Sequence, residues 1–243
     1  MGKMRLDKLL AGQGMLSRRE VKELVRRGRV TVNGAVEKKP ETAVDSDVDQ
    51  VCIDGRPIQV KQYLYLMLHK PQGVVSATQD SKFPTVLDLV PEEYRRKNLF
   101  PAGRLDKDTE GFLLITDDGD FAHRILAPKN KLPKRYTAVL DAPLPDNICE
   151  EFAKGVDIGG GDVTSPAELT VLEQGIQPRV SVVIYEGMYH QVKRMFERFG
   201  SKVIYLKREQ IGGLPLDPNL ALGTCRELEP QELEQLLCNE PLS

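Results

Sequence analysis

The spacing of apolar residues divides the chain into two regions with different patterns. In the first, about residues 1–60, apolar positions recur at helical spacing over residues 6–11, and a second helical stretch follows Ser17. Ser17 and Glu20 have the spacing of a capping box, and Gly28 stands where that helix is expected to end. The first region therefore begins with two short helices.

Strand signals complete this region. The segment RVTVNG alternates polar and apolar residues and ends in Asn33-Gly34, which predicts a β-hairpin. A further strand is expected over residues 48–53. The polar residues 55–62 are expected to form a linker. The pattern thus predicts a small α/β domain at residues 1–60, followed by a larger domain at residues 61–243.

The larger region alternates strand-like and helix-like segments in irregular order. Apolar runs and alternation predict strands at residues 63–70, 112–116, 135–142, 179–187 and 202–209. Helical spacing predicts helices at residues 120–127, 146–155 and 189–200, and from about Pro230. Because few of these segments form clean βαβ units, we expect an α+β domain with a mixed, mostly antiparallel sheet and flanking helices.

Composition narrows the class of protein. The 243 residues are 40% hydrophobic and 29% charged, which is ordinary for a globular protein, and no apolar run reaches the roughly 18 residues of a membrane span. The N-terminal segment lacks the long apolar core of a signal peptide. The cysteines are scattered without a C-x-x-C pair, which argues against zinc and disulfide scaffolds and indicates a reducing cytoplasm.

Charge is distributed unevenly along the chain. Residues 1–39 hold eleven Lys and Arg against four acids, so with a net charge of −2 the remainder carries about −9. A lone basic stripe is usually a solvated helix face, but further positive charge at Lys38 and Lys39 favours phosphate binding. The stripe, on one outer face of the second helix, consists of Arg18, Lys22, Arg26 and Arg29.

The order RLDKLLA … SRREVKELVRRGRVTVNG resembles the small S-four-type RNA-binding domain, over about residues 4–60. This resemblance implies that the first domain binds structured RNA and that the second acts on it. The basic side chains expected to contact RNA there are Arg5, Lys8, Arg18, Arg19, Lys22, Arg26 and Arg29.

One segment of the larger region, GRLDKDTEGFLLITDDG at residues 103–119, gathers acidic side chains around an apolar run. Asp117 and Asp118 stand between a strand and a helix, where a carboxylate favours the helix N-terminus. Asp106 and Asp108 precede the strand, in a loop that glycines 103 and 111 allow to bend. Their spacing alone is compatible with an acid–base pair, a Mg²⁺ site or a single nucleophile.

Three motifs, in this order, resemble those of pseudouridine synthases of the RsuA family, which carry the same basic N-terminal domain. They are HKPQG at residues 69–73, GRLDKDTEGFLLITDDG at 103–119 and EGMYHQVKRMF at 186–196. The resemblance implies that Asp106 is the catalytic residue, either as a nucleophile or as a base on the ribose 2′ proton, and that Asp108 is a variable loop residue. The implied reaction involves no redox or phosphoryl transfer, so no cofactor and no metal are expected.

The same resemblance implies further site residues. Tyr136 matches the aromatic residue that stacks on an extruded uracil, although a tyrosine in a strand is by itself more often a core residue. Arg104 is implied to enter the vacated base stack, and Lys70 with Pro71 to shape one wall of the site. His69 stands where the family often has Asn, and it is left out of the catalytic set.

Helical periodicity also identifies a basic side chain that can pair with Asp106. On the helix expected at residues 189–200, Lys193 flanks the buried face and can reach a partly buried carboxylate. The family's basic active-site residue also aligns with Lys193; the alternative is an exposed surface lysine. Arg194 is expected to face outward with His190 and Arg198, and the two arginines are expected to contact RNA.

The segments YHQVKRM and LKREQIGGLPLD most resemble family members that modify small-subunit ribosomal RNA. The expected substrate is one uridine of that RNA, free or in a pre-ribosomal small-subunit particle, and the expected enzyme is a cytoplasmic monomer without a membrane partner. Three alternatives stay open: a large-subunit RNA enzyme, a non-catalytic RNA-binding or assembly protein, and a base-excising glycosidase that uses Asp106 with Asp108.

Overall fold

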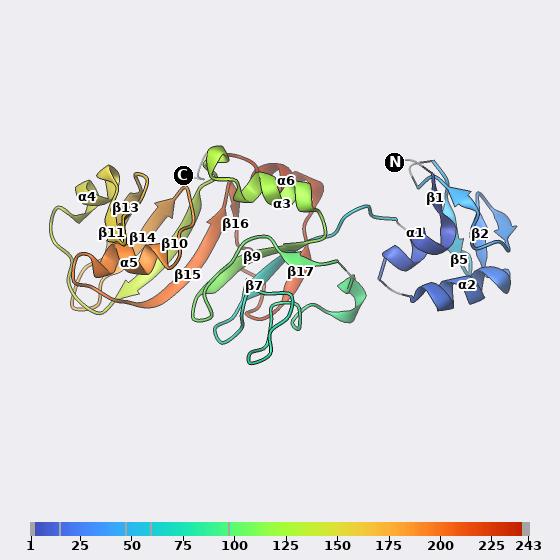
Figure 1. Cartoon of the computed structure of the whole chain (residues 1–243), viewed down its shortest axis with the longest axis horizontal. Coiled ribbons are helices and arrows are strands. Elements are labelled where there is room, and N and C mark those ends of the chain that lie inside the picture. The colour runs from blue at the N-terminus through green and yellow to red at the C-terminus, as the bar shows by residue number, and fades with distance from the viewer. Residues whose placement is uncertain (1–2, 15, 47, 59, 97, 240–243) are drawn as a thin grey trace. The chain divides into compact units, whose positions relative to one another are not determined.

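The computed structural model describes residues 3–14, 16–46, 48–58, 60–96 and 98–239. The chain forms two compact units, residues 1–64 with 90–99 and residues 65–89 with 100–243 (Figure 1). Gln59, in the segment expected to be a linker, lies outside the described residues. Within the described ranges, none of the helices combines the length and the apolarity needed to cross a membrane.

The first unit consists of two helices packed on small antiparallel sheets. Helix α1 (Leu6–Gly12) contacts α2 (Arg18–Arg26), and the core between them and the sheet is made of leucine and valine side chains. One sheet has the order β3-β2-β5-β6, formed by β2 (Val30–Val32), β3 (Ala35–Glu37), β5 (Val51–Ile53) and β6 (Arg56–Pro57). The other pairs β1 (Met4–Arg5) with β4 (Ala43–Val44), and a 3-10 turn, η1 (Glu92–Tyr94), also belongs to this unit.

Local sequence signals act here as expected. The Ser17 hydroxyl accepts the Glu20 N–H at 3.3 Å, and the Glu20 carboxylate accepts the Ser17 N–H at 2.7 Å, which completes the capping box of α2. Asn33 and Gly34 both have positive φ, at 52° and 81°, as the turn between β2 and β3 requires. The capping box and the hairpin are therefore confirmed.

The second unit is centred on one mixed sheet with the strand order β13-β14-β10-β15-β9-β7-β17. These strands are β7 (Tyr65–Lys70), β9 (Glu110–Thr116), β10 (Lys134–Leu140), β13 (Glu168–Glu173), β14 (Arg179–Ile184), β15 (Val203–Ile211) and β17 (Cys225–Glu227). Three shorter pairings involve β8 (Phe100–Pro101) with β9, β16 (Leu214–Pro215) with β15, and β11 (Asp157–Gly159) with β12 (Asp162–Val163). Among these described strands, all pairs are antiparallel except β9 with β15.

The parallel junction between β9 and β15 depends on a glycine. Gly111 lies opposite Arg208, with a φ of +110°, and a Cβ placed on it would lie 2.1 Å from the Arg208 carbonyl oxygen. Only glycine permits that approach. The expectation that Gly111 bends a loop was wrong: it belongs to β9, and the missing side chain lets two strands meet.

Helices cover the two halves of this sheet separately (Figure 1). Helices α3 (Gly119–Leu126) and α6 (Pro230–Leu236) share a buried core with β7 and β9, and the 3-10 turn η2 (Pro128–Asn130) follows α3. Helices α4 (Ile148–Lys154) and α5 (Gln191–Glu197) contact strands of the other half, and the rings of Phe152 and Phe196 lie 5.0 Å apart between them. The α+β fold with flanking helices is confirmed.

Asp118 has the structural role expected from its position. Its carboxylate accepts the Phe121 N–H at 3.0 Å at the start of α3, and it also accepts the Tyr65 hydroxyl at 2.6 Å. This carboxylate caps a helix and lies outside the residues that line the site described next.

Candidate active site

The loop between β8 and β9 presents the Asp106 side chain. Gly103, with a φ of +94°, allows the loop to turn, and Ser76 holds it in place. The Ser76 hydroxyl donates to the Leu105 carbonyl at 2.8 Å and accepts the Leu105 N–H at 3.0 Å. The residue before Asp106 is thus fixed through both of its backbone polar groups.

Lys70 holds the other side of this loop. Its side chain is fully buried, and its ammonium donates to the carbonyl oxygens of Asp106 at 3.0 Å, Thr109 at 2.9 Å and Pro71 at 3.0 Å. Burial lowers the pKa of Lys70 to about 8, against the opposing pull of nearby carboxylates. Lys70 therefore acts on the backbone around Asp106 and is absent from the cavity lining, which differs from the wall that the sequence suggested.

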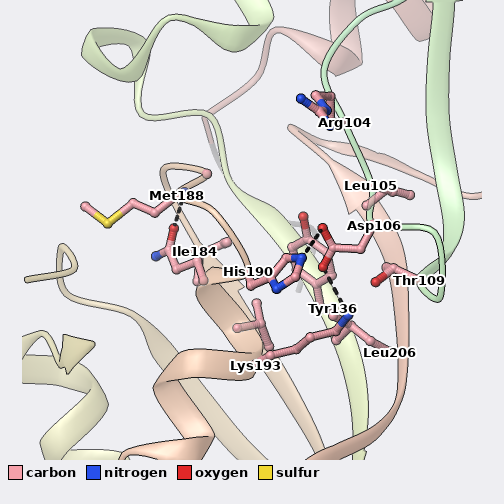
Figure 2. A pocket seen from close by; sticks show the side chains of 13 residues that line it. Arg104, Leu105, Asp106, Thr109, Tyr136, Ile184, Met188, His190, Lys193 and Leu206 are labelled. Carbon is pink, nitrogen blue, oxygen red and sulfur yellow. Dashed lines mark hydrogen bonds and ion pairs between the residues drawn. The ribbon is translucent and has the colours of Figure 1, made fainter. Parts of the chain in front are cut away.

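The Asp106 carboxylate faces two basic side chains (Figure 2). Lys193 Nζ lies 3.1 Å from one carboxylate oxygen, and His190 Nε2 lies 3.5 Å from the other. The Asp106 side chain is 29% exposed and that of Lys193 is 16% exposed. Burial by itself lowers the pKa of Lys193, but hydrogen bonds and attraction from Asp108 and Asp106 outweigh it and raise that pKa above its usual value. Lys193 is therefore a charged partner of Asp106.

Asp108 shares this lysine. Its Oδ1 lies 2.5 Å from Lys193 Nζ, although its side chain is 69% exposed. Burial raises the pKa of Asp108, yet the hydrogen bond and charge of Lys193 outweigh that effect and lower it overall. The sequence interpretation of Asp108 as a loop residue missed this contact, which the two-residue spacing from Asp106 could have suggested.

Tyr136, on β10, lines the same cavity as Asp106 and Lys193. The cavity measures about 800 Å³, and Tyr136 itself is 7% exposed. Arg208 from β15 donates to the Tyr136 hydroxyl at 3.4 Å and to the Phe112 carbonyl at 2.8 Å. The sequence did not single out Arg208, which is 4% exposed and joins the tyrosine to the β9–β15 junction.

Arg104 lies at the opening of this cavity. Its side chain is exposed and, in Figure 2, points away from the Asp106 carboxylate. In the described part of the chain, no hydrogen bond or ion pair engages its guanidinium. Arg104 is thus available to a ligand that enters the cavity.

Two side chains near α5 depart from the helical wheel. His190, expected to face outward, has a left-handed φ of 50° and faces Asp106, because α5 begins only at Gln191. Arg194, also expected to face outward, donates to the carbonyls of Ile158 at 3.2 Å and Gly159 at 2.8 Å. The prediction that Arg194 faces solvent was wrong because the β11–β12 hairpin covers that face of α5. The prediction for His190 was wrong because this residue precedes the helix. Arg198 is exposed.

The basic side chains of the first unit that are expected to contact RNA fall into three groups. Arg5 and Arg18 lie 3.0 Å and 3.2 Å from the fully buried carboxylate of Asp7, and Lys22 lies 3.9 Å away. Arg29, by contrast, pairs with Asp54, which occupies its guanidinium. The remaining exposed members of the expected RNA-binding set are Lys8, Arg19 and Arg26.

This arrangement offers the Asp106 carboxylate, held by a cation that Asp108 shares, in a cavity of ligand size that an aromatic ring also lines. A carboxylate so held can attack an electrophilic carbon or remove a proton from a ligand. Among the described residues, no group of three or more His, Cys, Asp or Glu side chains is arranged to hold a metal ion.

Comparison with known proteins identifies relatives of both units. The family model described as RNA pseudouridylate synthase matches residues 64–198, and the S4 domain model matches residues 4–49. An uncharacterized RNA pseudouridine synthase of Bacillus subtilis is 47% identical over 98% of this chain and 99% of its own length. The ribosomal small subunit pseudouridine synthase A of Escherichia coli is 42% identical over 96% of this chain and 100% of its own. A crystal structure of a pseudouridylate synthase, 35% identical, covers 96% of this chain and 99% of its own with a TM-score of 0.66.

Proposed function

The chain belongs to the RsuA family of RNA pseudouridine synthases with an N-terminal S4 domain, and on that basis we propose that it converts one uridine of small-subunit ribosomal RNA to pseudouridine. The choice of RNA is supported by relatives from Escherichia coli and Yersinia pestis, 42% and 44% identical, whose names state the ribosomal small subunit. The Bacillus subtilis relative, at 47%, names no particular RNA, so the choice needs its own test.

The observation that best supports this chemistry is the ion pair of Asp106 with Lys193 in the cavity that Tyr136 also lines. Isomerisation breaks the bond from uracil N1 to ribose C1′ and forms one from uracil C5 to C1′. N1 gains a proton and C5 loses one, so the nucleotide keeps its mass and oxidation state. One well-placed carboxylate suffices for this rearrangement.

Each side chain then has a distinct task. Asp106 acts as a nucleophile or as a base on the ribose 2′ proton. Lys193 orients the carboxylate, and Tyr136 stacks on the uracil, which must leave the RNA helix to enter the cavity. Lys70 holds the loop backbone, and Arg104, exposed at the opening, enters the space that the extruded base leaves.

The S4 domain supplies RNA binding, and we assign its phosphate contacts to the basic face of α1 and α2. The group around Asp7 keeps a net positive charge, because three cations share one carboxylate. Arg29 and Arg194 contribute less, since Asp54 and the β11–β12 hairpin already engage them. Exposed Arg198 adds an RNA contact on the catalytic domain. We place that domain at residues 61–243, of which residues 61–64 and 90–99 group with the first unit.

Tritium release from RNA labelled at uracil C5 tests this proposal. Wild-type protein is incubated with small- and large-subunit ribosomal transcripts, each as free RNA and as precursor particles. Release from a small-subunit substrate alone is the expected result. Release from large-subunit RNA would overturn the choice of subunit. Free uracil as the product would indicate a glycosidase, and no release from any substrate would indicate a non-catalytic RNA-binding protein.

A further inference from the structure

Tyr189 is an aromatic side chain that the proposed chemistry leaves without a role. It lies in the turn between β14 and α5, and its side chain is 76% exposed. In the described part of the chain, its hydroxyl has no hydrogen-bond partner. Apolar ring surface held in water contributes nothing to the stability of this turn.

The ring has a fixed support beneath it. Tyr189 stacks on His190 with ring centroids 3.8 Å apart and planes inclined by 16°, so one face of the tyrosine is covered and the other is open. His190 in turn lies 3.5 Å from the Asp106 carboxylate (Figure 2). The two rings therefore lead from the catalytic carboxylate to the protein surface.

Polar contacts hold this turn without help from the tyrosine ring. Gln191 accepts the Met188 N–H at 2.9 Å and donates to Glu186 at 3.0 Å. Arg194 donates to the Tyr189 carbonyl at 3.2 Å and anchors the turn to the β11–β12 hairpin. The backbone of the turn is thus fixed, and the stack on His190 orients the exposed ring before any ligand arrives, which reduces the entropy lost on binding.

Tyr189 also lines the cavity that contains Asp106 and Tyr136, together with exposed Arg104. A uridine that enters this cavity leaves its neighbour in the RNA chain without a stacking partner. That neighbour must lie at the cavity opening, because the backbone connects it directly to the extruded nucleotide. A flat, supported aromatic face in a cavity that a cation also lines is the kind of surface on which unpaired bases stack.

We propose that Tyr189, supported by His190, is a stacking platform for the nucleobase next to the target uridine in the RNA chain. This inference rests on the proposed function, since it requires an RNA substrate in the Asp106 cavity. Stacking does not distinguish strongly among the four bases, so the platform contributes affinity and position more than sequence choice.

The chain contains no tryptophan, so Tyr189→Trp introduces a single tryptophan at the platform, whose fluorescence can be excited apart from that of the tyrosines. Leu172→Trp, at a half-exposed position on the edge strand β13, is the matched control. With an RNA fragment that wild type converts, we expect quenching of the tryptophan at 189 and not of the one at 172. Replacing the neighbouring nucleotide with an abasic one should abolish the quenching.

Kinetics provide the second readout. Tyr189→Ala should raise KM about 5- to 150-fold, the range for loss of one base–aromatic stack, with kcat at saturation changed less than about threefold. Tyr189→Phe keeps the ring and should restore KM. On abasic RNA, wild type and Tyr189→Ala should have equal KM.

Unchanged KM in Tyr189→Ala, or quenching that persists on abasic RNA, would overturn the stacking platform. The proposed function would still stand in that case, because wild type converts the RNA fragment. If wild type formed no pseudouridine in any ribosomal RNA, both proposals would fail together.

Discussion

Replacing Lys193 with methionine should slow pseudouridine formation without unfolding the protein. The ammonium lies 3.1 Å from Asp106, and at an effective dielectric constant of about 20 this separation corresponds to about 5 kcal/mol of gross attraction. Because the Asp106 side chain is 29% exposed, water will replace part of that interaction in the variant. We take about 2–3 kcal/mol as the net loss, which corresponds to a kcat about 30- to 150-fold lower.

Single-turnover tritium release at saturating enzyme measures this effect directly. Lys193→Arg keeps a cation and should recover most of the rate. Lys154→Met removes an exposed lysine of α4 that pairs with Glu151, and it should behave as wild type. A folded Lys193→Met variant within threefold of wild type would refute the proposed role, as would a Lys193→Arg variant as slow as the methionine one.

Three further predictions concern the two units separately. Replacing both Lys22 and Arg26 with glutamine should weaken RNA binding, measured by filter binding. The slope of log binding constant against log salt concentration should become shallower by the amount expected for about two lost phosphate contacts. An unchanged slope would mean that another surface binds the RNA. In urea unfolding, Gly111→Ala should destabilise the second unit by about 3–5 kcal/mol, because the added Cβ would overlap the Arg208 carbonyl oxygen. Gly223→Ala is the control: its φ is also positive but the space around it is open, so it should cost about 1 kcal/mol. Burial lowers the pKa of Lys70 to about 8, so between about pH 8 and pH 10.4 the folded protein binds fewer protons than the unfolded chain. The unfolding free energy of wild type, relative to that of Lys70→Met, should therefore rise with pH across this window. Unfolding free energies of the two proteins that change in parallel with pH would contradict this prediction.

Features governed by local sequence could be predicted well. The capping box of α2, the Asn33-Gly34 hairpin and the Asp118 cap each depend on residues within a few positions of one another. The position of Lys193 beside Asp106 also follows from helical periodicity, because the lysine lies inside α5.

Features governed by tertiary contacts could not be predicted. The outward orientation of Arg194 fails because a hairpin distant in sequence covers that face of α5. The orientation of His190 was wrong because His190 itself is left-handed, so that the helical period of α5 begins only after it, at Gln191. In the sequence, Gly111 has the surroundings of a loop glycine, and its structural role is evident only from the close approach of β15. The contact of Lys193 with Asp108 as well as Asp106 was also missed, although the two-residue spacing of the two acids is compatible with it.

We propose that Asp106 alone carries out the chemistry, although Lys193 contacts Asp108 as well. The most direct test compares single-turnover pseudouridine formation by wild type, Asp106→Asn and Asp108→Asn on the same ribosomal RNA, with RNA binding measured for each variant. We expect Asp106→Asn to bind RNA and form no detectable pseudouridine, and Asp108→Asn, whose side chain is 69% exposed, to stay within about threefold of wild type. Comparable losses in both variants would show that Asp108 also takes part in the chemistry, and pseudouridine formation by Asp106→Asn would rule out Asp106 as the catalytic carboxylate.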